Sequence, residues 1–217
     1  MLKVGLTGGI ASGKSAVGEM FVALGAHLTQ ADLIAHELML PGQRVYDEVV
    51  DHFGREILNP DGSVNRSKLA EAAFGAANSA DKKNSRIEEL NKIVHPAVVR
   101  QQDAWMEAVA QQDPHGVAIV EAALIIEAGA ASHFDRLIVV TCSEDQRAVR
   151  FAARQEIPLE DARKEVARRM AVQIPDAEKS KAAHYVIDNS GTLEATREQV
   201  GSIWQHMRIE THSRGST

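Results

Sequence analysis

Hydrophobic positions near the start of the chain change from an alternating to a helical pattern. Leu2, Val4 and Leu6 alternate with other residues, as is typical of a short strand. Beyond residue 16, hydrophobic residues recur at the spacing of one helical face; they are Val17, Met20, Phe21 and Leu24. The pattern therefore predicts a strand, a connecting loop and a helix, in that order.

Later hydrophobic runs are continuous, which indicates strands that are buried on both faces. Residues 117–120 and 137–141 form such runs, and residues 185–187 are a weaker candidate. A short strand over residues 27–32, ending in Asp32, is also predicted. Because helical patterns lie between these segments, we expect a doubly wound α/β fold with a mostly parallel sheet. The loops that follow the strands would then meet at one edge of the sheet, where ligands bind.

The pattern changes between about residue 36 and residue 113, where polar, helical segments replace buried strands. Turn-forming residues at 59–62, Asn-Pro-Asp-Gly, separate the pieces of this region. The dipeptide His95-Pro96 is expected to end one helix and to start the next. We therefore expect a core with a helical insertion: the core is residues 1–35 and 113–217, and the insertion is residues 36–112.

Residues 8–15, GGIASGKS, lie between the first predicted strand and helix and match the phosphate-binding motif G-x-x-x-x-G-K-[ST]. Glycines let main-chain N–H groups face an anion, and the following helix adds its positive N-terminal end. Lys14 would neutralise the β- and γ-phosphates of a nucleoside triphosphate, and the Ser15 hydroxyl would bind a bridging Mg²⁺. A glycine-rich turn with a solvated lysine would explain neither the flanking elements nor the Gly-Lys-Ser order. The core is thus predicted to be a P-loop nucleotide-binding core.

The loop and the first helical turn supply the expected contacts to the nucleotide. These residues are Gly9, Ala11, Ser12, Gly13, Lys14, Ser15 and Ala16.

A site of phosphoryl transfer also needs a group that orients the acceptor. Asp32, predicted at the end of a strand beside the loop strand, can accept the proton of an attacking hydroxyl or hold a Mg²⁺-bound water. A helix N-cap explains the same aspartate, and the two roles are compatible at the start of a helix. Glu121 and Glu127 flank the third strand region, and either can serve the metal instead. The residues alone leave the assignment of the acid open.

Residues 147–169 form a second cationic region, with seven basic and four acidic residues in an acidic protein. Arg147, Arg150 and Arg154 are spaced i, i+3, i+7, so they share one face of a helix. A solvated helical face with ordinary charge pairs accounts for this pattern. A lid over residues 143–178, which closes cationic side chains over the transferring phosphates, accounts for it equally well.

The amino-acid composition limits the classes of partner that this protein is expected to bind. The formal net charge of −6 argues against general binding to nucleic acid or to a membrane surface, which usually requires a basic surface. No run approaches the roughly 18 apolar residues of a membrane span, and no secretory signal is recognisable. Cys142 is the single cysteine, which excludes an intrachain disulfide and favours a reducing compartment. We expect a cytoplasmic protein with a small-molecule partner, neither nucleic acid nor membrane, and with Cys142 buried near a strand end.

Six segments, in this order along the chain, resemble the dephospho-CoA kinase family. They are LTGGIASGKS at 6–15, ADLIA at 31–35, VHP at 94–96, EAALIIE at 121–127, QIP at 173–175 with Lys179, and YVIDNSG at 185–191. The matches cover nearly the whole chain. The resemblance implies a P-loop kinase that uses ATP and Mg²⁺ to phosphorylate the ribose 3′-hydroxyl of dephospho-CoA. The products would be CoA and ADP, in the last step of coenzyme A synthesis.

The resemblance also implies roles for individual residues. Lys14 and Ser15 would be the phosphate and magnesium groups, and Asp32 would be the base toward the 3′-hydroxyl and a substrate contact. His95 falls in the His-Pro segment of a coenzyme A-binding helical region, which corresponds to the insertion 36–112. Arg150 and Arg154 fall near the arginines of a mobile lid.

The chain departs from the family pattern at several positions. Gln30 stands where members usually have an aspartate, and His36 stands where they usually have an arginine. Ala123 begins a segment that is usually Pro-Leu-Leu, and Gln155 follows Arg154 where an aspartate is common. Because of the departures at Gln30 and His36, a substrate contact is expected to be missing or supplied by other residues.

Two other functions fit parts of the pattern. A regulatory GTPase would explain Asp51-His52-Phe53-Gly54 as a D-x-x-G motif, but this segment falls in the helical insertion, and Asn91-Lys92 lacks the aspartate of N-K-x-D. A kinase acting on a nucleotide or a small hydroxy acid would have a similar loop and lid. The segment 31–35, together with His95-Pro96, favours dephospho-CoA over these acceptors.

Overall fold

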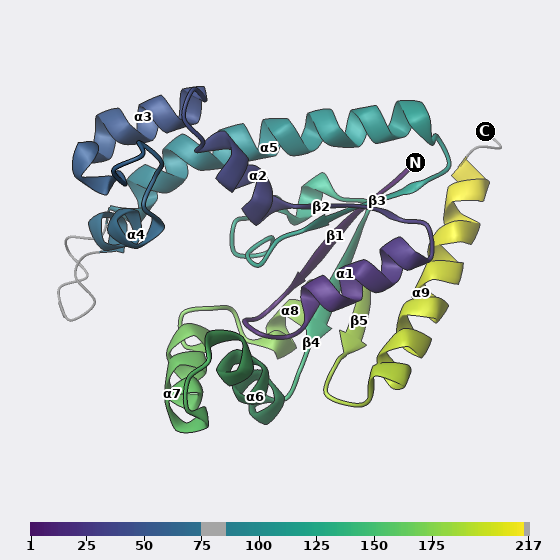
Figure 1. Cartoon of the computed structure of the whole chain (residues 1–217). Helices are drawn as coiled ribbons and strands as arrows, with labels where there is room; N and C mark the ends of the chain where they lie inside the picture. Colours follow the sequence, from purple (N-terminus) through teal and green to yellow (C-terminus); the bar gives the residue numbers. More distant parts are fainter. Residues whose placement is uncertain (75–85, 215–217) are drawn as a thin grey trace. The chain divides into compact units, whose positions relative to one another are not determined.

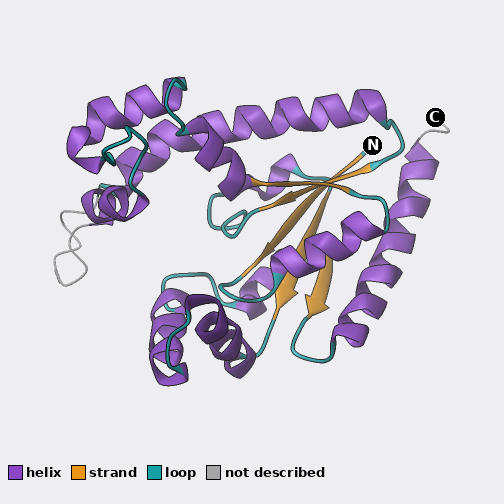
Figure 2. Cartoon of the chain, in the orientation of Figure 1, coloured by secondary structure: helices purple, strands orange, loops and turns teal. Residues whose placement is uncertain are grey.

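A parallel sheet of five strands, in the order β2-β3-β1-β4-β5, forms the centre of one part of the chain (Figures 1 and 2). The computed structural model describes residues 1–74 and 86–214. The strands are β1 (Leu2–Gly8), β2 (His27–Gln30), β3 (Val117–Glu121), β4 (Arg136–Thr141) and β5 (Tyr185–Asp188). Each neighbouring pair is parallel. The predicted α/β fold is confirmed, including the weak strand near residue 186.

The order of the strands reverses direction at β1. The chain leaves β1 toward β2 on one side of the sheet, and β4 and β5 extend the other side. In open α/β sheets, ligands bind beyond the carboxyl ends of the strands at such a switch point. The loop after β1, which carries the phosphate-binding motif, lies at this position.

Helices α1 (Lys14–Ala23) and α9 (Leu193–Arg214) cover one face of the sheet (Figure 1). Their buried side chains pack on the central strands; they include Val17, Phe21, Val200, Ile203 and Met207. On β1, a Cβ atom at Gly5 would lie 2.9 Å from Phe134 Cδ2 and 3.1 Å from Ile125 Cδ1. A glycine at this position therefore lets the segment that follows β3 pack directly on the sheet.

Three helices connect β4 to β5. They are α6 (Glu144–Gln155), α7 (Leu159–Met170) and α8 (Asp176–Ala182), and the short η3 (Ala130–His133) precedes β4. Phe151 of α6 packs against Ala162 and Val166 of α7. The Ser143 hydroxyl caps α6 by accepting a hydrogen bond from the Gln146 N–H.

Residues Ala31–Trp105 form a second compact unit, and Met1–Gln30 with Met106–Thr217 form the first. The second unit contains α2 (Ala31–Leu38), α3 (Arg44–Phe53), η1 (Arg55–Ile57), α4 (Arg66–Phe74) and the first part of α5 (Ile87–Gln112). Its core is built mainly from Val45, Val49, Phe53, Ile57 and Leu69. The predicted turn is present, and Gly62 adopts a φ of 84° beside the bridge between Leu58 and Val64.

Two predicted boundaries are wrong. Strand β2 ends at Gln30 and not at Asp32, which lies in the first turn of α2. An aspartate there interacts favourably with the positive end of the helix, so α2 begins before it. Pro96 lies inside the continuous helix α5 and does not end it. Proline loses one backbone hydrogen bond, but its φ is helical, and burial of Ala97 and Val98 directly after it favours continuation.

Candidate functional site

The phosphate-binding loop, residues 8–15, connects β1 to α1 with an unusual backbone. Gly13 is the N-cap of α1 and adopts a left-handed conformation with a φ of 91°. A Cβ atom at Gly13 would overlap the side-chain nitrogen of Asn189, so both space and backbone angle require glycine here. Ala11 also has a positive φ, 52°, which costs a residue with a Cβ about 1–2 kcal/mol. Such strain is common where a backbone is shaped to hold a ligand.

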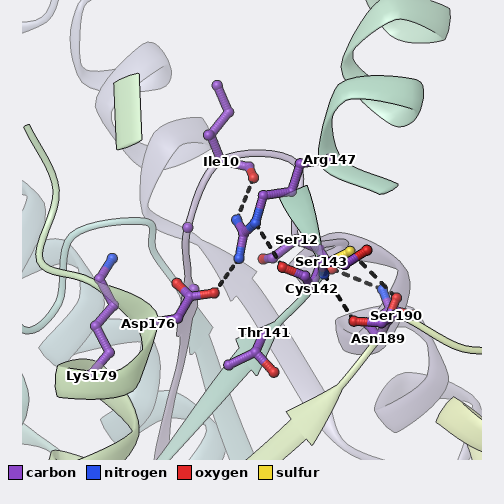
Figure 3. A network of polar contacts seen from close by, with 12 residues as sticks. Ile10, Ser12, Thr141, Cys142, Ser143, Arg147, Asp176, Lys179, Asn189 and Ser190 are labelled. Carbon is purple, nitrogen blue, oxygen red and sulfur yellow. Dashed lines mark hydrogen bonds and ion pairs between the residues drawn. The ribbon is translucent and has the colours of Figure 1, made fainter. Parts of the chain in front are cut away.

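Two arginines of α6 hold carbonyl groups of this loop, and Figure 3 shows the one at position 147. Arg147 is fully buried and donates hydrogen bonds to the carbonyl oxygens of Ile10, at 2.6 Å, and Cys142, at 3.0 Å. Arg150 donates to the carbonyl oxygen of Ser12 at 3.2 Å. These contacts fix the outer side of the loop, so the conformation of the anion site depends on α6.

The buried charge of Arg147 is balanced by Asp176, the first residue of α8, with which it forms an ion pair (Figure 3). The sequence placed Arg147, Arg150 and Arg154 on one helical face but did not distinguish them. The structure does: Arg147 is buried, Arg150 is half-buried against the loop, and Arg154 is exposed, with its guanidinium 5.7 Å from the centre of the Phe151 ring. Arg147 is therefore a structural cation of the loop.

Other contacts to the loop come from Lys14 and Asn189. The Lys14 ammonium group donates to the carbonyl oxygens of Gly8, at 3.0 Å, and Gly9, at 3.3 Å. The Asn189 carboxamide donates to the Ser12 carbonyl at 2.8 Å. Asn189 belongs to segment 185–191, and local sequence patterns give no sign of its contact with a residue so distant in the chain.

The structure separates the two glutamates that the sequence left as alternatives. The Ser15 hydroxyl donates to Glu121 Oε1 at 2.8 Å, and Glu121 is buried at the end of β3. Glu127 instead forms an ion pair of 2.7 Å with Lys179, whose side chain is fully buried. Of these two glutamates, Glu121 is therefore the one beside the phosphate-binding loop.

The donor set near Ser15 fits Mg²⁺. A hydroxyl and a carboxylate are hard oxygen ligands, and Mg²⁺ is commonly bound by one or two protein groups together with phosphate oxygens and water. No group of three or more His, Cys, Asp and Glu side chains that could hold a metal occurs in the described residues. Ser15 and Glu121 thus suit an ion that arrives with the triphosphate.

Asp32 and His95 both belong to the unit Ala31–Trp105. Asp32 is exposed in the first turn of α2, and His95 is exposed on α5, directly before Pro96. Their exposure leaves both side chains accessible to a substrate. Their roles in base catalysis and substrate binding stay predictions.

Cys142 follows β4 and is buried, as the sequence predicts. Burial raises the pKa of its thiol, although Arg150 and Arg147 act in the opposite direction. A thiol with a raised pKa is a poor nucleophile near neutral pH. Cys142 is therefore a packing residue beside the loop.

The position of the D-x-x-G segment argues against a regulatory GTPase. The D-x-x-G segment at 51–54 lies at the end of α3 and not after a strand, so it lacks the setting of a GTPase switch. Among the helices of the described residues, none combines the length and the apolar character that crossing a membrane requires.

The sequence matches a family model described as dephospho-CoA kinase over residues 2–195. A curated dephospho-CoA kinase from Geobacter metallireducens is 40% identical over 214 residues, which cover 99% of this chain and 100% of the relative. One from Corynebacterium efficiens is 38% identical over 203 residues, covering 94% of this chain and 96% of the relative.

Solved structures show the same fold. The crystal structure of TT1252 from Thermus thermophilus has a TM-score of 0.74 at 26% identity, with 94% of this chain and 97% of that chain covered. A dephospho-CoA kinase from Campylobacter jejuni has a TM-score of 0.63 at 24% identity, with 99% and 98% covered. A shikimate kinase from Acinetobacter baumannii, at 12% identity and a TM-score of 0.50 with 97% and 94% covered, shares the fold alone. The fold by itself therefore does not identify the acceptor.

Proposed function

This chain belongs to the dephospho-CoA kinase family, and we propose how its residues carry out the activity of that family. The function is the transfer of the γ-phosphate of ATP to the ribose 3′-hydroxyl of dephospho-CoA. The products are CoA and ADP, and the reaction is the last step of coenzyme A synthesis. The family predicted from the six sequence segments is thereby confirmed.

The observation that carries the proposal is the conformation of the phosphate-binding loop. Side chains of Arg147, Arg150 and Asn189 engage its carbonyl oxygens from outside. With its carbonyl groups held in this way, the loop and the first turn of α1 would present main-chain N–H groups to the β- and γ-phosphates of ATP. The Lys14 ammonium group, which contacts the Gly8 carbonyl, would add a positive charge to the same phosphates.

We propose that Ser15 and Glu121 hold the metal side of this site. A bound Mg²⁺ would neutralise the charge of the β- and γ-phosphates. The hydrogen bond from Ser15 to Glu121 orients the Ser15 oxygen, so that its lone pairs are free to face the ion. The buried carboxylate adds negative charge where a cation is required.

Asp32 is proposed as the base. During transfer, a bond forms between the ribose 3′-oxygen and the γ-phosphorus, and the bond from this phosphorus to the β,γ-bridging oxygen breaks. The proton of the 3′-hydroxyl passes to the Asp32 carboxylate. Because such transition states are loose, alignment and charge neutralisation matter more than strong basicity.

The remaining assignments concern substrate binding and closure. We propose that the helical insertion, residues 36–112, binds the coenzyme A part of the substrate, with His95 among its contacts. The segment 143–178 is proposed as the lid. On closure, Arg150 and Arg154 would exchange their contacts with the Ser12 carbonyl and the Phe151 ring for contacts with the phosphates. A single cysteine cannot form an intrachain disulfide, which suits a reducing compartment, so we propose that the enzyme acts in the cytoplasm.

The variant Asp32→Asn tests the role of the base. It should lower turnover by about 100-fold or more, because general-base catalysis contributes about that much. The affinity for ATP should stay within a few-fold, since the change removes a proton acceptor and no triphosphate contact. Lys14→Ala is the matched comparison, because it should lose activity with every acceptor. Wild-type turnover in Asp32→Asn would exclude the assignment.

A further inference from the structure

Gln30 and Glu121 are the last residues of neighbouring parallel strands, and they are paired in register. Paired residues of neighbouring strands project their side chains to the same side, about 4.8 Å apart. Glu121 is also in register with Leu6 of β1. The fold therefore forces the side chain at position 30 to lie beside the Glu121 carboxylate.

Both oxygens of the Glu121 carboxylate accept hydrogen bonds from neighbouring side chains. Gln30 Nε2 donates to Glu121 Oε2 at 3.1 Å, and the Ser15 hydroxyl donates to Glu121 Oε1 at 2.8 Å. Each carboxylate oxygen thus accepts one hydrogen bond. A carboxylate with only 8% of its residue surface exposed needs such donors, because an unsatisfied buried charge is costly. Together the two donors fix the orientation of the carboxylate plane.

Position 30 requires a side chain that can donate a hydrogen bond to the Glu121 carboxylate. A carboxamide can donate a hydrogen bond to Glu121, whereas an ionised carboxylate can only accept one. An aspartate or glutamate at position 30 would place a second negative charge beside a buried one, and two such groups do not both ionise readily. Gln30, which departs from the family pattern, is therefore matched to the acid of β3.

We propose that Gln30 is a positioning residue for the metal side of the nucleotide site. Its carboxamide holds the Glu121 carboxylate against Ser15, so that this pair presents a single, fixed negative charge to the metal ion. The proposal rests on the assignment of Ser15 and Glu121 to Mg²⁺ made above. At the carboxyl ends of this strand pair, the acidic group is on β3, and its partner on β2 is neutral.

The test is calorimetric titration of the full-length protein with ADP, in Mg²⁺ and in EDTA. Gln30→Met, which keeps the length of the side chain but removes the donor, should weaken ADP binding in Mg²⁺ by about ten-fold, the effect of one hydrogen bond to a charged group. Binding in EDTA should change by less than about two-fold. Gln43→Met, the same substitution at an exposed glutamine of the other unit, is the control and should change neither.

Two further variants separate positioning from simple packing. Gln30→Glu should weaken Mg²⁺-dependent binding more than Gln30→Met does, because it adds repulsion to the loss of a donor. The double variant Gln30→Glu/Glu121→Gln restores one carboxylate and one carboxamide, so it should bind better than either single variant in Mg²⁺. Urea unfolding without nucleotide shows that each variant is folded before titration.

The outcomes distinguish the two proposals. Glu121→Gln with wild-type Mg²⁺-dependent binding would contradict the metal assignment itself. A weakened Glu121→Gln together with an unaffected Gln30→Met would overturn the role of Gln30 alone. Equal losses for Gln30→Met in Mg²⁺ and in EDTA, or a double variant no better than Glu121→Gln, would also overturn it.

Discussion

The side chain of Asn189 donates a hydrogen bond of 2.8 Å to the carbonyl oxygen of Ser12, although 177 positions separate the two residues in the sequence. Asn189 directly follows β5, and its Oδ1 accepts a hydrogen bond of 2.9 Å from the Thr196 hydroxyl of α9. The oxygen of the carboxamide is thus oriented by α9, and its nitrogen holds the phosphate-binding loop. Through Asn189, the phosphate-binding loop is held by the residue that directly follows the last strand of the sheet.

Asn189→Asp should weaken ADP binding by about 10- to 100-fold, as expected for the loss of a hydrogen bond from a buried group plus an added negative charge. Aspartate keeps the shape but cannot donate to Ser12, and it repels the phosphates. Calorimetric titration measures the change. Thr196→Val is the matched control: it removes the other hydrogen bond of Asn189 and should stay within a few-fold of the wild type. An Asn189→Asp variant with wild-type affinity would contradict this role.

The ion pair between Lys179 and Glu127 makes a prediction about stability. Lys179 is fully buried, so Lys179→Met leaves the Glu127 carboxylate without its cation. The free energy of unfolding should fall by about 3–5 kcal/mol, as for other broken buried pairs. Urea denaturation followed by circular dichroism measures it.

The double variant Lys179→Met/Glu127→Met is the control for this pair. Replacing both charges removes the unpaired carboxylate, so most of the lost stability should return. If the double variant is as unstable as the sum of both single variants, the two side chains act independently and the interpretation is wrong.

Glu165 makes a prediction about pH. Hydrogen bonds from Arg168, and then from Arg169, lower the pKa of its carboxyl group to about 2. Because the folded pKa lies below the ordinary value of 4.5, the stabilisation is present above that value and disappears as the pH falls through about 2. Glu165→Gln should therefore cause a small loss of stability at pH 7, since the pair is solvent-screened, and no loss near pH 2. A difference from the wild type that is constant from pH 7 to pH 2 would refute this.

Cys142 should resist alkylation in the folded protein. Burial raises the pKa of its thiol, so little thiolate is present at pH 8. Mass spectrometry after iodoacetamide treatment should show slow labelling without denaturant and fast labelling in concentrated urea. Equal rates in the two conditions would mean that the thiol is accessible in the native state.

The sequence predicted the parts of the site that depend on local patterns. The phosphate-binding loop is contiguous in the sequence. Residues 117–120 and 137–141 could be predicted as buried strands because their hydrophobic runs do not alternate with polar residues. The predictions for the end of β2 and for the path of α5 were wrong. The start of a helix at Ala31 and the tolerance of α5 for Pro96 both have only weak signals in the local sequence.

Other parts depend on tertiary structure and have no local signal. The contact of Gln30 with Glu121 follows from strand order and register, which an edge strand of four residues does not reveal in sequence. The buried role of Arg147 requires knowing that α8 brings Asp176 to it. Helical spacing alone could only say that Arg147 shares a face with Arg150.

The central claim is that this chain phosphorylates dephospho-CoA. The most direct measurement is ADP formation from ATP and Mg²⁺ by the purified full-length protein, with dephospho-CoA, adenosine, nucleoside monophosphates and shikimate as separate acceptors. With dephospho-CoA, one CoA should form for each ADP released, and the other acceptors should give little turnover. No turnover with dephospho-CoA, or faster turnover with any other acceptor, would contradict the claim.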